Sequence, residues 1–399
     1  MVCGAVAPLT LKFVDSAMSD IPKFVWRSKE WLNRQTAIGQ PTKGGLGLYS
    51  IRDRLEAYHV RHLADFLWGP PVKWRGLASY FIALVMRRWS PDVWNNHTPH
   101  SDSPPPPPYC ATALAAFKRY ANTGVAVDEK STTVKLVYNK FVEDKFLPPR
   151  VESLSPAIDF GATWRALTHG DMSPEARDTV WRAVHNILPV RTFLAKMGYT
   201  CLTTCPMCES QPESVVHIFT QCATARFIWT YIESKFAVKL PRDRIKILHL
   251  NFDYDDAQLA QTTAVVCGEV MHAMWVCRNH AHFDGEAHSR NRIMRAGLAR
   301  VRLRVRADFS RLPADEFDAR WGRHGAYARV GPDGLRQILV GARSCAPLAA
   351  RACVQSHRPL AAGEGGGNRV RPPPRGGLVH VAYNTDCCSL IDRISTRYM

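Results

Sequence analysis

A cluster of soft metal ligands at short spacing constrains this chain more than any other feature. Two cysteines, a histidine and a third cysteine follow one another as C-x2-C-x8-H-x4-C, at Cys205, Cys208, His217 and Cys222. Four such ligands within 18 residues match a tetrahedral Zn²⁺ site that is closed by protein groups. We therefore predict a structural zinc site here. The alternative is four reduced side chains packed in a core.

Cys201 leaves one detail of this prediction open. The run C-x3-C-x2-C contains two candidates for the first ligand, Cys201 and Cys205. A C-x2-C pair presents two thiolates from a single tight turn, and it is the commoner arrangement. We therefore favour Cys205 over Cys201 as the ligand.

The residues around these ligands resemble a known family. The apolar segment Leu188–Gly198 precedes the first cysteines, Glu213 stands four residues before His217, and Trp229 follows the last cysteine. This arrangement resembles the reverse-transcriptase zinc-binding domain at the C-terminal end of non-LTR (LINE-type) retrotransposon polyproteins. Looser similarities are a W-x-x-K segment followed by GGLG, and a W-x-x-R-N…F-x-G ending at 275–285. Together they extend the resemblance to about 20–90 and 160–285.

The resemblance implies a role in gripping template RNA or target DNA during target-primed reverse transcription. It also implies a partner, the polymerase portion of the same element, and makes this chain a C-terminal remnant without endonuclease or palm. Asp255-Asp256 lacks the F/Y-x-D-D pattern of a polymerase because position 253 is Asp. We interpret this segment as an acidic loop that caps the next helix. No catalytic residue and no small-molecule site is predicted.

Hydrophobic periodicity predicts a mainly α fold, with small helical domains around the zinc site and a disordered basic tail. Helices are expected over 51–67, 111–120, 132–146, 257–282 and 289–312. A further helix is expected to start at Ser173-Pro174. The predicted domains are a post-thumb-like connector (1–97), a proline-rich linker (98–110), a helical connector (111–158), the zinc-binding domain (159–285), a basic helical arm (286–340) and a disordered tail (341–399).

The charge of the chain predicts a polyanionic partner. The net charge is +17, and residues 287–399 hold 20 arginines, no lysine and 8 acidic residues, a net +12. Nucleic acid is the usual partner of such a surface. The predicted RNA- or DNA-binding residues lie on the helix over 289–312: Arg290, Arg292, Arg295, Arg300, Arg302, Arg304, Arg306 and Arg311. The alternative is an arginine-rich surface that is merely solvated.

Two other expectations follow from composition. Twelve unevenly placed cysteines in a chain of this length do not form a disulfide framework. No apolar run is long enough to span a membrane, and the first residues lack the features of a signal peptide. We expect an intracellular protein, in the nucleus or the cytoplasm. Two rival functions stay open: a helical zinc scaffold that binds other proteins, and an inert product of a decayed element.

Overall fold

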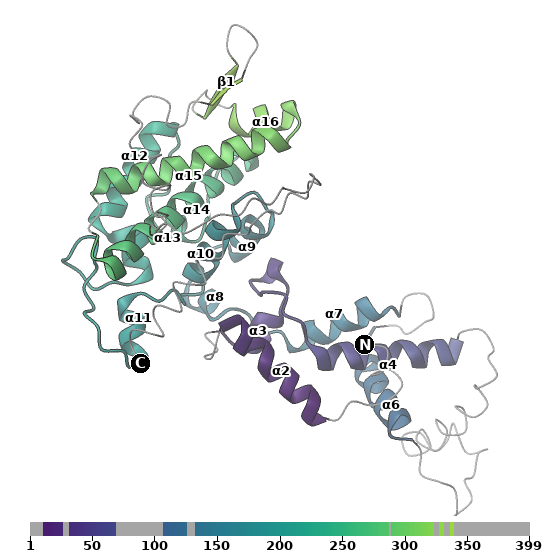
Figure 1. The fold of residues 1–399 in the computed structure, drawn as a ribbon. Helices are drawn as coiled ribbons and strands as arrows, with labels where there is room; N and C mark the ends of the chain where they lie inside the picture. The colour runs from purple at the N-terminus through teal and green to yellow at the C-terminus, as the bar shows by residue number, and fades with distance from the viewer. Residues whose placement is uncertain are drawn as a thin grey trace, which may run out of the picture. The chain divides into compact units, whose positions relative to one another are not determined.

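The computed structural model describes residues 11–26, 32–68, 107–125, 132–286, 289–322, 327–330 and 336–338. Most of them are helical, which confirms the predicted fold class (Figure 1). The described strands, β1 (Ala328–Val330) and β2 (Arg336–Ile338), form one short antiparallel pair. Most of the predicted linker and all of the tail, 341–399, lie outside the described residues. Within the described residues, no helix combines the length and apolar character that a bilayer crossing requires.

The helices before the metal motif are mostly short. They are α2 (Leu11–Trp26), α3 (Arg34–Ile38), the 3₁₀ turn η1 (Pro41–Lys43), α4 (Ile51–Trp68), α6 (Pro108–Ala121), α7 (Val134–Lys145), α8 (Arg150–Leu154), α9 (Phe160–Thr168), α10 (Pro174–Val184) and α11 (Arg191–Lys196). The predictions for α4, α7 and the start of α10 are confirmed. Helix α6 starts three residues before the predicted 111, because proline at its first position needs no intrahelical N–H bond.

The metal motif and the elements after it complete the fold. These elements are the π-helical turn η2 (His217–Gln221), α12 (Ala223–Phe236), α13 (Ile245–Leu248), α14 (Ala257–Asn279), the π-helical turn η3 (His280–Asp284), α15 (Arg290–Arg311) and α16 (Ala314–Trp321). The predicted helices over 257–282 and 289–312 are thereby confirmed. The first of them ends in η3.

Helices α4, α6 and α7 pack on one another around a small apolar cluster of their own. Tyr120 and Phe141 meet edge to face at its centre. The carboxylate of Asp53, at the start of α4, is buried beside this cluster. It accepts hydrogen bonds from Lys145 at 2.7 Å and from Arg119 at 3.0 Å. These charge-assisted bonds join the three helices at one end.

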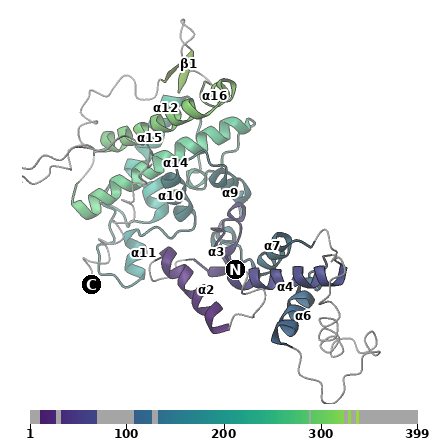
Figure 2. The ribbon, with the colours of Figure 1, turned by 45° about the vertical axis from the view of Figure 1, so that its right-hand side comes forward.

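A second, larger core extends from Ile158 to Ala328 and contains the metal motif. Its central element is α14, of whose 23 residues 16 are buried, as expected for a helix covered on all sides. Helix α15 lies beside it in both views (Figures 1 and 2). Gly297 permits this approach, because a Cβ there would stand 3.3 Å from a methyl of Val270. The basic helix is therefore an integral part of the core.

The glycine-rich turn after η1 docks on the same core. The carbonyl oxygen of Gly44 accepts hydrogen bonds from Trp181 Nε1 at 3.1 Å and His185 Nε2 at 2.8 Å. Gly44 has a φ of 84°, and a Cβ there would stand 2.7 Å from the Trp164 ring. Only glycine fits this conformation and this space. This turn thus fastens the residues before α4 to the core.

Candidate metal centre

The first two ligands stand on a tight loop that hydrogen bonds close. The carbonyl of Cys205 accepts from the amide of Glu209 at 2.8 Å, and the amide of Cys205 donates to Gln211 at 2.8 Å. Glu209 takes up a φ of 54°, which allows the loop to reverse. An isolated β-bridge between Thr204 and Pro212 closes its base. This loop places the thiols of Cys205 and Cys208 on the same side.

The other two ligands flank the π-helical turn η2. The amide of Cys222 donates to the carbonyl of His217 at 2.7 Å, a bond between residues five apart. In a regular α-helix, residues five apart point about 140° away from each other. The wider π-helical turn instead brings both side chains to one side. The H-x4-C spacing thus corresponds to one helical turn of the π type.

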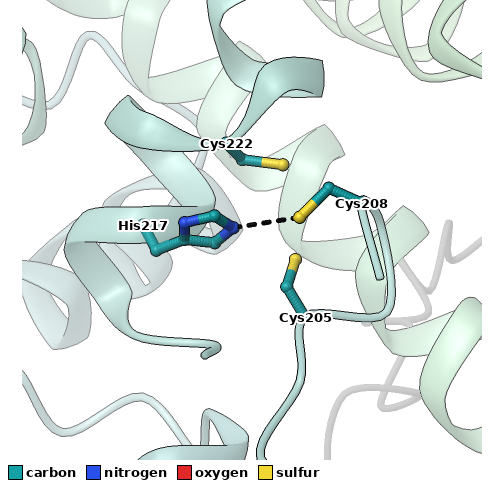
Figure 3. Close-up of side chains that lie close together, drawn as sticks. All are labelled: Cys205, Cys208, His217 and Cys222. Carbon is teal, nitrogen blue, oxygen red and sulfur yellow. Dashed lines mark hydrogen bonds between the residues drawn. The ribbon is translucent and has the colours of Figure 1, made fainter. Parts of the chain in front are cut away.

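The four side chains converge on a common point (Figure 3). All four donor atoms lie within 4.8 Å of one another, and Cys208 Sγ stands 3.3 Å from His217 Nε2. Zn–S and Zn–N bonds of about 2.3 and 2.0 Å place tetrahedral ligands roughly 3.5–3.8 Å apart. The donor set and its spacing therefore fit a Zn²⁺ ion whose four coordination positions are all filled by protein ligands. Cys201 is not part of the group, and its thiol faces the carbonyl of Arg191 at 3.6 Å.

The environment of the Cys222 thiol favours its ionised form. The pKa of the Cys222 thiol is lowered to about 5, first by a hydrogen bond from Cys205, whose own pKa is raised. The amides of Thr224 and Ala225, at the start of α12, act on Cys222 in the same direction. Ser210 donates a hydrogen bond to Cys208 Sγ at 3.4 Å. Hydrogen bonds of this kind orient thiolate ligands and stabilise their charge.

A buried ion pair anchors the ligand loop to the central helix. The guanidinium of Arg278, on α14, donates to both carboxylate oxygens of Glu213 at 2.5 Å. Both side chains are at most 1% exposed. Glu213 immediately precedes the segment that carries His217. The pair therefore fixes the second half of the ligand set against the core.

The Glu213 carboxylate also binds the first residue of α11. Glu213 Oε2 accepts from the amide of Arg191 at 2.6 Å, and Arg191 Nη1 donates to the carbonyl of Thr204 at 2.6 Å. Arg191 thus contacts the residue before Cys205, on the first half of the ligand set. In the sequence, Glu213 and Arg278 stand out only as parts of a resemblance. Their shared role becomes visible only once the fold has brought them together.

The structure divides the eight arginines predicted to contact nucleic acid into two groups. Arg300, Arg304 and Arg311 are tied to buried acids. Arg300 donates to Glu269 at 3.1 Å, whereas Arg304 and Arg311 both bond to Asp308, Arg311 at 3.1 Å. Asp308 is fully buried and also accepts from Trp321 and Arg320. Arg300 thus holds α15 to α14, whereas Arg304 and Arg311 bond within α15 to an acid that α16 also contacts.

The remaining five arginines have no buried acid as a partner among the described residues. Arg292, Arg295, Arg302 and Arg306 follow one side of α15, and Arg290 stands at its first turn. Arg292 makes a long ion pair with Glu286, at 3.7 Å, in which both side chains are more than half exposed. Exposed pairs of this kind contribute little to stability. We name Arg292, Arg295, Arg302 and Arg306 the arginine stripe.

The acidic segment before α14 has the predicted structural role. Asp256 caps the helix, accepting from the amides of Gln258 and Leu259 at 2.9 and 3.1 Å. Tyr254 donates to the carbonyl of Lys239 at 2.9 Å. The expectation that this segment caps the next helix is confirmed.

Comparison with known families agrees with this geometry. Residues 133–229 match the family model described as zinc-binding in reverse transcriptase. The match starts at the N-cap of α7, ends in α12 and includes all four candidate ligands. In this stretch the chain is therefore similar to the zinc-binding domain of reverse transcriptases. No curated protein matches the chain.

Proposed function

We propose that this chain is a zinc-stabilised nucleic-acid-binding part of a LINE-type retrotransposon reverse transcriptase. In this role it grips template RNA or target DNA during target-primed reverse transcription, beside the polymerase portion of the same element. One observation carries the proposal: a closed Cys/His ligand set lies inside a stretch that matches the reverse-transcriptase zinc-binding family. The net charge of +17 supports a polyanionic partner.

The metal's part in this proposal is structural. Four protein ligands leave no open position, so bound Zn²⁺ would hold the loop and η2 together rather than activate water. Cys205 and Cys208 would fix the loop, and His217 and Cys222 would fix the start of α12. Ligand thiolates need reduced cysteine, which agrees with an intracellular location in the nucleus or the cytoplasm. Every described cysteine is a free thiol.

We propose no catalytic role for this chain. Two-metal chemistry at a primer end requires carboxylates free to hold both ions. Asp256 caps α14. It also follows the zinc motif in the sequence, whereas the polymerase of the family that the chain resembles precedes that motif. We expect the purified chain to extend no primer on an RNA template with Mg²⁺ or Mn²⁺. Template-dependent extension that is abolished in Asp255→Ala would contradict this expectation.

Nucleic-acid binding is tested by the anisotropy of labelled RNA and DNA titrated with the full chain at several salt concentrations. We expect binding whose affinity falls steeply with salt, because phosphate contacts release counterions. The zinc-loaded protein should bind more tightly than protein stripped with a chelator. Binding that is absent at low salt, or that ignores salt, would favour the rival role as a protein-binding scaffold.

A further inference from the structure

The arginine stripe has a regular geometry on the surface of α15. At about 100° per residue, Arg292, Arg295, Arg302 and Arg306 fall within roughly 80° of one another around the helix. Arg292, Arg295 and Arg306 are exposed, and Arg302 is half-buried. The acid within the helix, Asp308, is buried on the opposite side. The stripe is therefore a row of four arginines, three of them exposed, on a helix whose other side is fixed in the core.

Along the helix axis, the stripe consists of two pairs. Arg292 and Arg295 form the first pair, and Arg302 and Arg306 form the second. At about 1.5 Å per residue, the centres of the two pairs lie roughly 16 Å apart. The major groove of B-DNA is about 12 Å wide and the minor groove about 6 Å. Two pairs about 16 Å apart therefore bracket a groove about 12 Å wide, with one pair at each phosphate ridge, whereas a groove of about 6 Å is much narrower than their spacing.

The residues between the two pairs carry no charge on the exposed side. Ala299 and Leu303 occupy the exposed positions there, and Leu303 is 59% exposed. Neither side chain can donate a hydrogen bond to a base edge or accept one. No aromatic residue of α15 stands between the two pairs, whereas proteins that bind single strands usually stack bases on aromatic rings. The stripe therefore suits the backbone of a duplex better than a single strand.

We infer that α15 lies across a wide groove of a double helix, with one arginine pair on each phosphate ridge. This inference rests on the proposed nucleic-acid-binding function. It identifies the ligand as a nucleic-acid duplex that is bound without regard to its base sequence. The shared chemistry is two phosphate ridges across a wide groove. B-form DNA offers these at its major groove, and A-form RNA offers them at its wide, shallow minor groove.

The test compares the full chain with two double variants on matched ligands. Arg292→Gln/Arg295→Gln removes one pair, and Arg302→Gln/Arg306→Gln removes the other. The ligands are a DNA duplex, an RNA duplex of the same sequence, and the single strands of each. Each variant should lower the log–log salt slope on duplex DNA by about 1.8, because each arginine that binds a phosphate adds about 0.9 to that slope. A comparison of the DNA duplex with the RNA duplex shows which of the two the chain binds more tightly.

The matched control is Arg165→Gln/Arg242→Gln, which removes the same charge at exposed positions outside α15. It should leave most of the slope intact. Circular dichroism and thermal unfolding show whether each variant keeps its fold, which we expect because the changed side chains face solvent.

A hydroxyl-radical footprint tests the two-ridge geometry itself. The wild-type chain should protect one patch on each strand, on opposite sides of one groove, and each double variant should erase one patch. A single patch on one strand, or equal affinity for duplex and single strands, would overturn this inference and leave the proposed function standing. A chain that binds no nucleic acid at low salt would instead overturn the proposed function.

Discussion

At the scale of single residues, the ligands and the residues that position them differ in how far the sequence predicts them. The four ligands lie within 18 residues, so their spacing alone indicates a metal site. Arg278 and Glu213 lie 65 residues apart. An arginine in a helix is ordinarily exposed, and no local pattern marks one whose guanidinium is buried. The residue that anchors the loop is therefore not predictable from the sequence.

We predict that Arg278→Met destabilises the zinc-loaded protein by about 3–5 kcal/mol, because Glu213 is left charged and buried without a partner. The double variant Glu213→Gln/Arg278→Met should recover part of this stability, since it removes the unpaired charge. Urea unfolding measures both.

The control for this prediction is Asp178→Asn, which breaks an exposed ion pair with Arg182 on α10. Its cost should stay within about 1 kcal/mol. A cost for Arg278→Met no larger than that of the control would show that the buried pair does not anchor the loop.

At the scale of elements, helix positions are predictable and helix orientations are not. Ser173 caps α10 and Ser289 caps α15, because their side-chain oxygens accept amide hydrogen bonds within the first turn. These are local signals. Which arginines of α15 turn inward depends on Asp308 and Glu269, whose burial only the fold decides. The eight arginines look alike in sequence, yet three of them bond to buried acids.

The docked turn at Gly44 gives a prediction at this scale. Gly44→Ala should destabilise the protein by about 2 kcal/mol or more, since alanine meets both an unfavourable φ and the Trp164 ring. Gly170→Ala is the matched control, because Gly170 has a φ of 81° and nothing within 4 Å of its would-be Cβ. Gly170→Ala should lower the stability by about 1 kcal/mol, which is the cost of the unfavourable φ alone. Equal destabilisation in thermal unfolding would argue against docking of the turn.

At the scale of the whole molecule, three buried or half-buried histidines make stability depend on pH. Burial lowers the pKa of His185, His249 and His272 from 6.5 to about 4. The unfolded chain therefore binds protons between pH 6.5 and 4 that the folded chain does not. Stability is fully present above pH 6.5 and decreases as the pH falls toward 4. The decrease is on the order of 2–3 kcal/mol per histidine.

Urea unfolding at a series of pH values checks this dependence. Zinc release, followed in parallel with a coloured chelator, separates the histidine effect from protonation of the metal ligands. In His185→Asn, the slope of stability against pH should be smaller between pH 6.5 and 4. An unchanged slope would contradict a buried, neutral His185.

The central claim is that Cys205, Cys208, His217 and Cys222 hold one structural zinc ion. Its most direct test is elemental analysis of the full chain, purified without chelator, beside single variants of each cysteine and of His217. We predict about one zinc per chain in the wild type and in Cys201→Ser, and no retained zinc in Cys208→Ser and His217→Ala. Wild-type protein without zinc would contradict the claim, as would zinc that survives Cys205→Ser but is absent from Cys201→Ser.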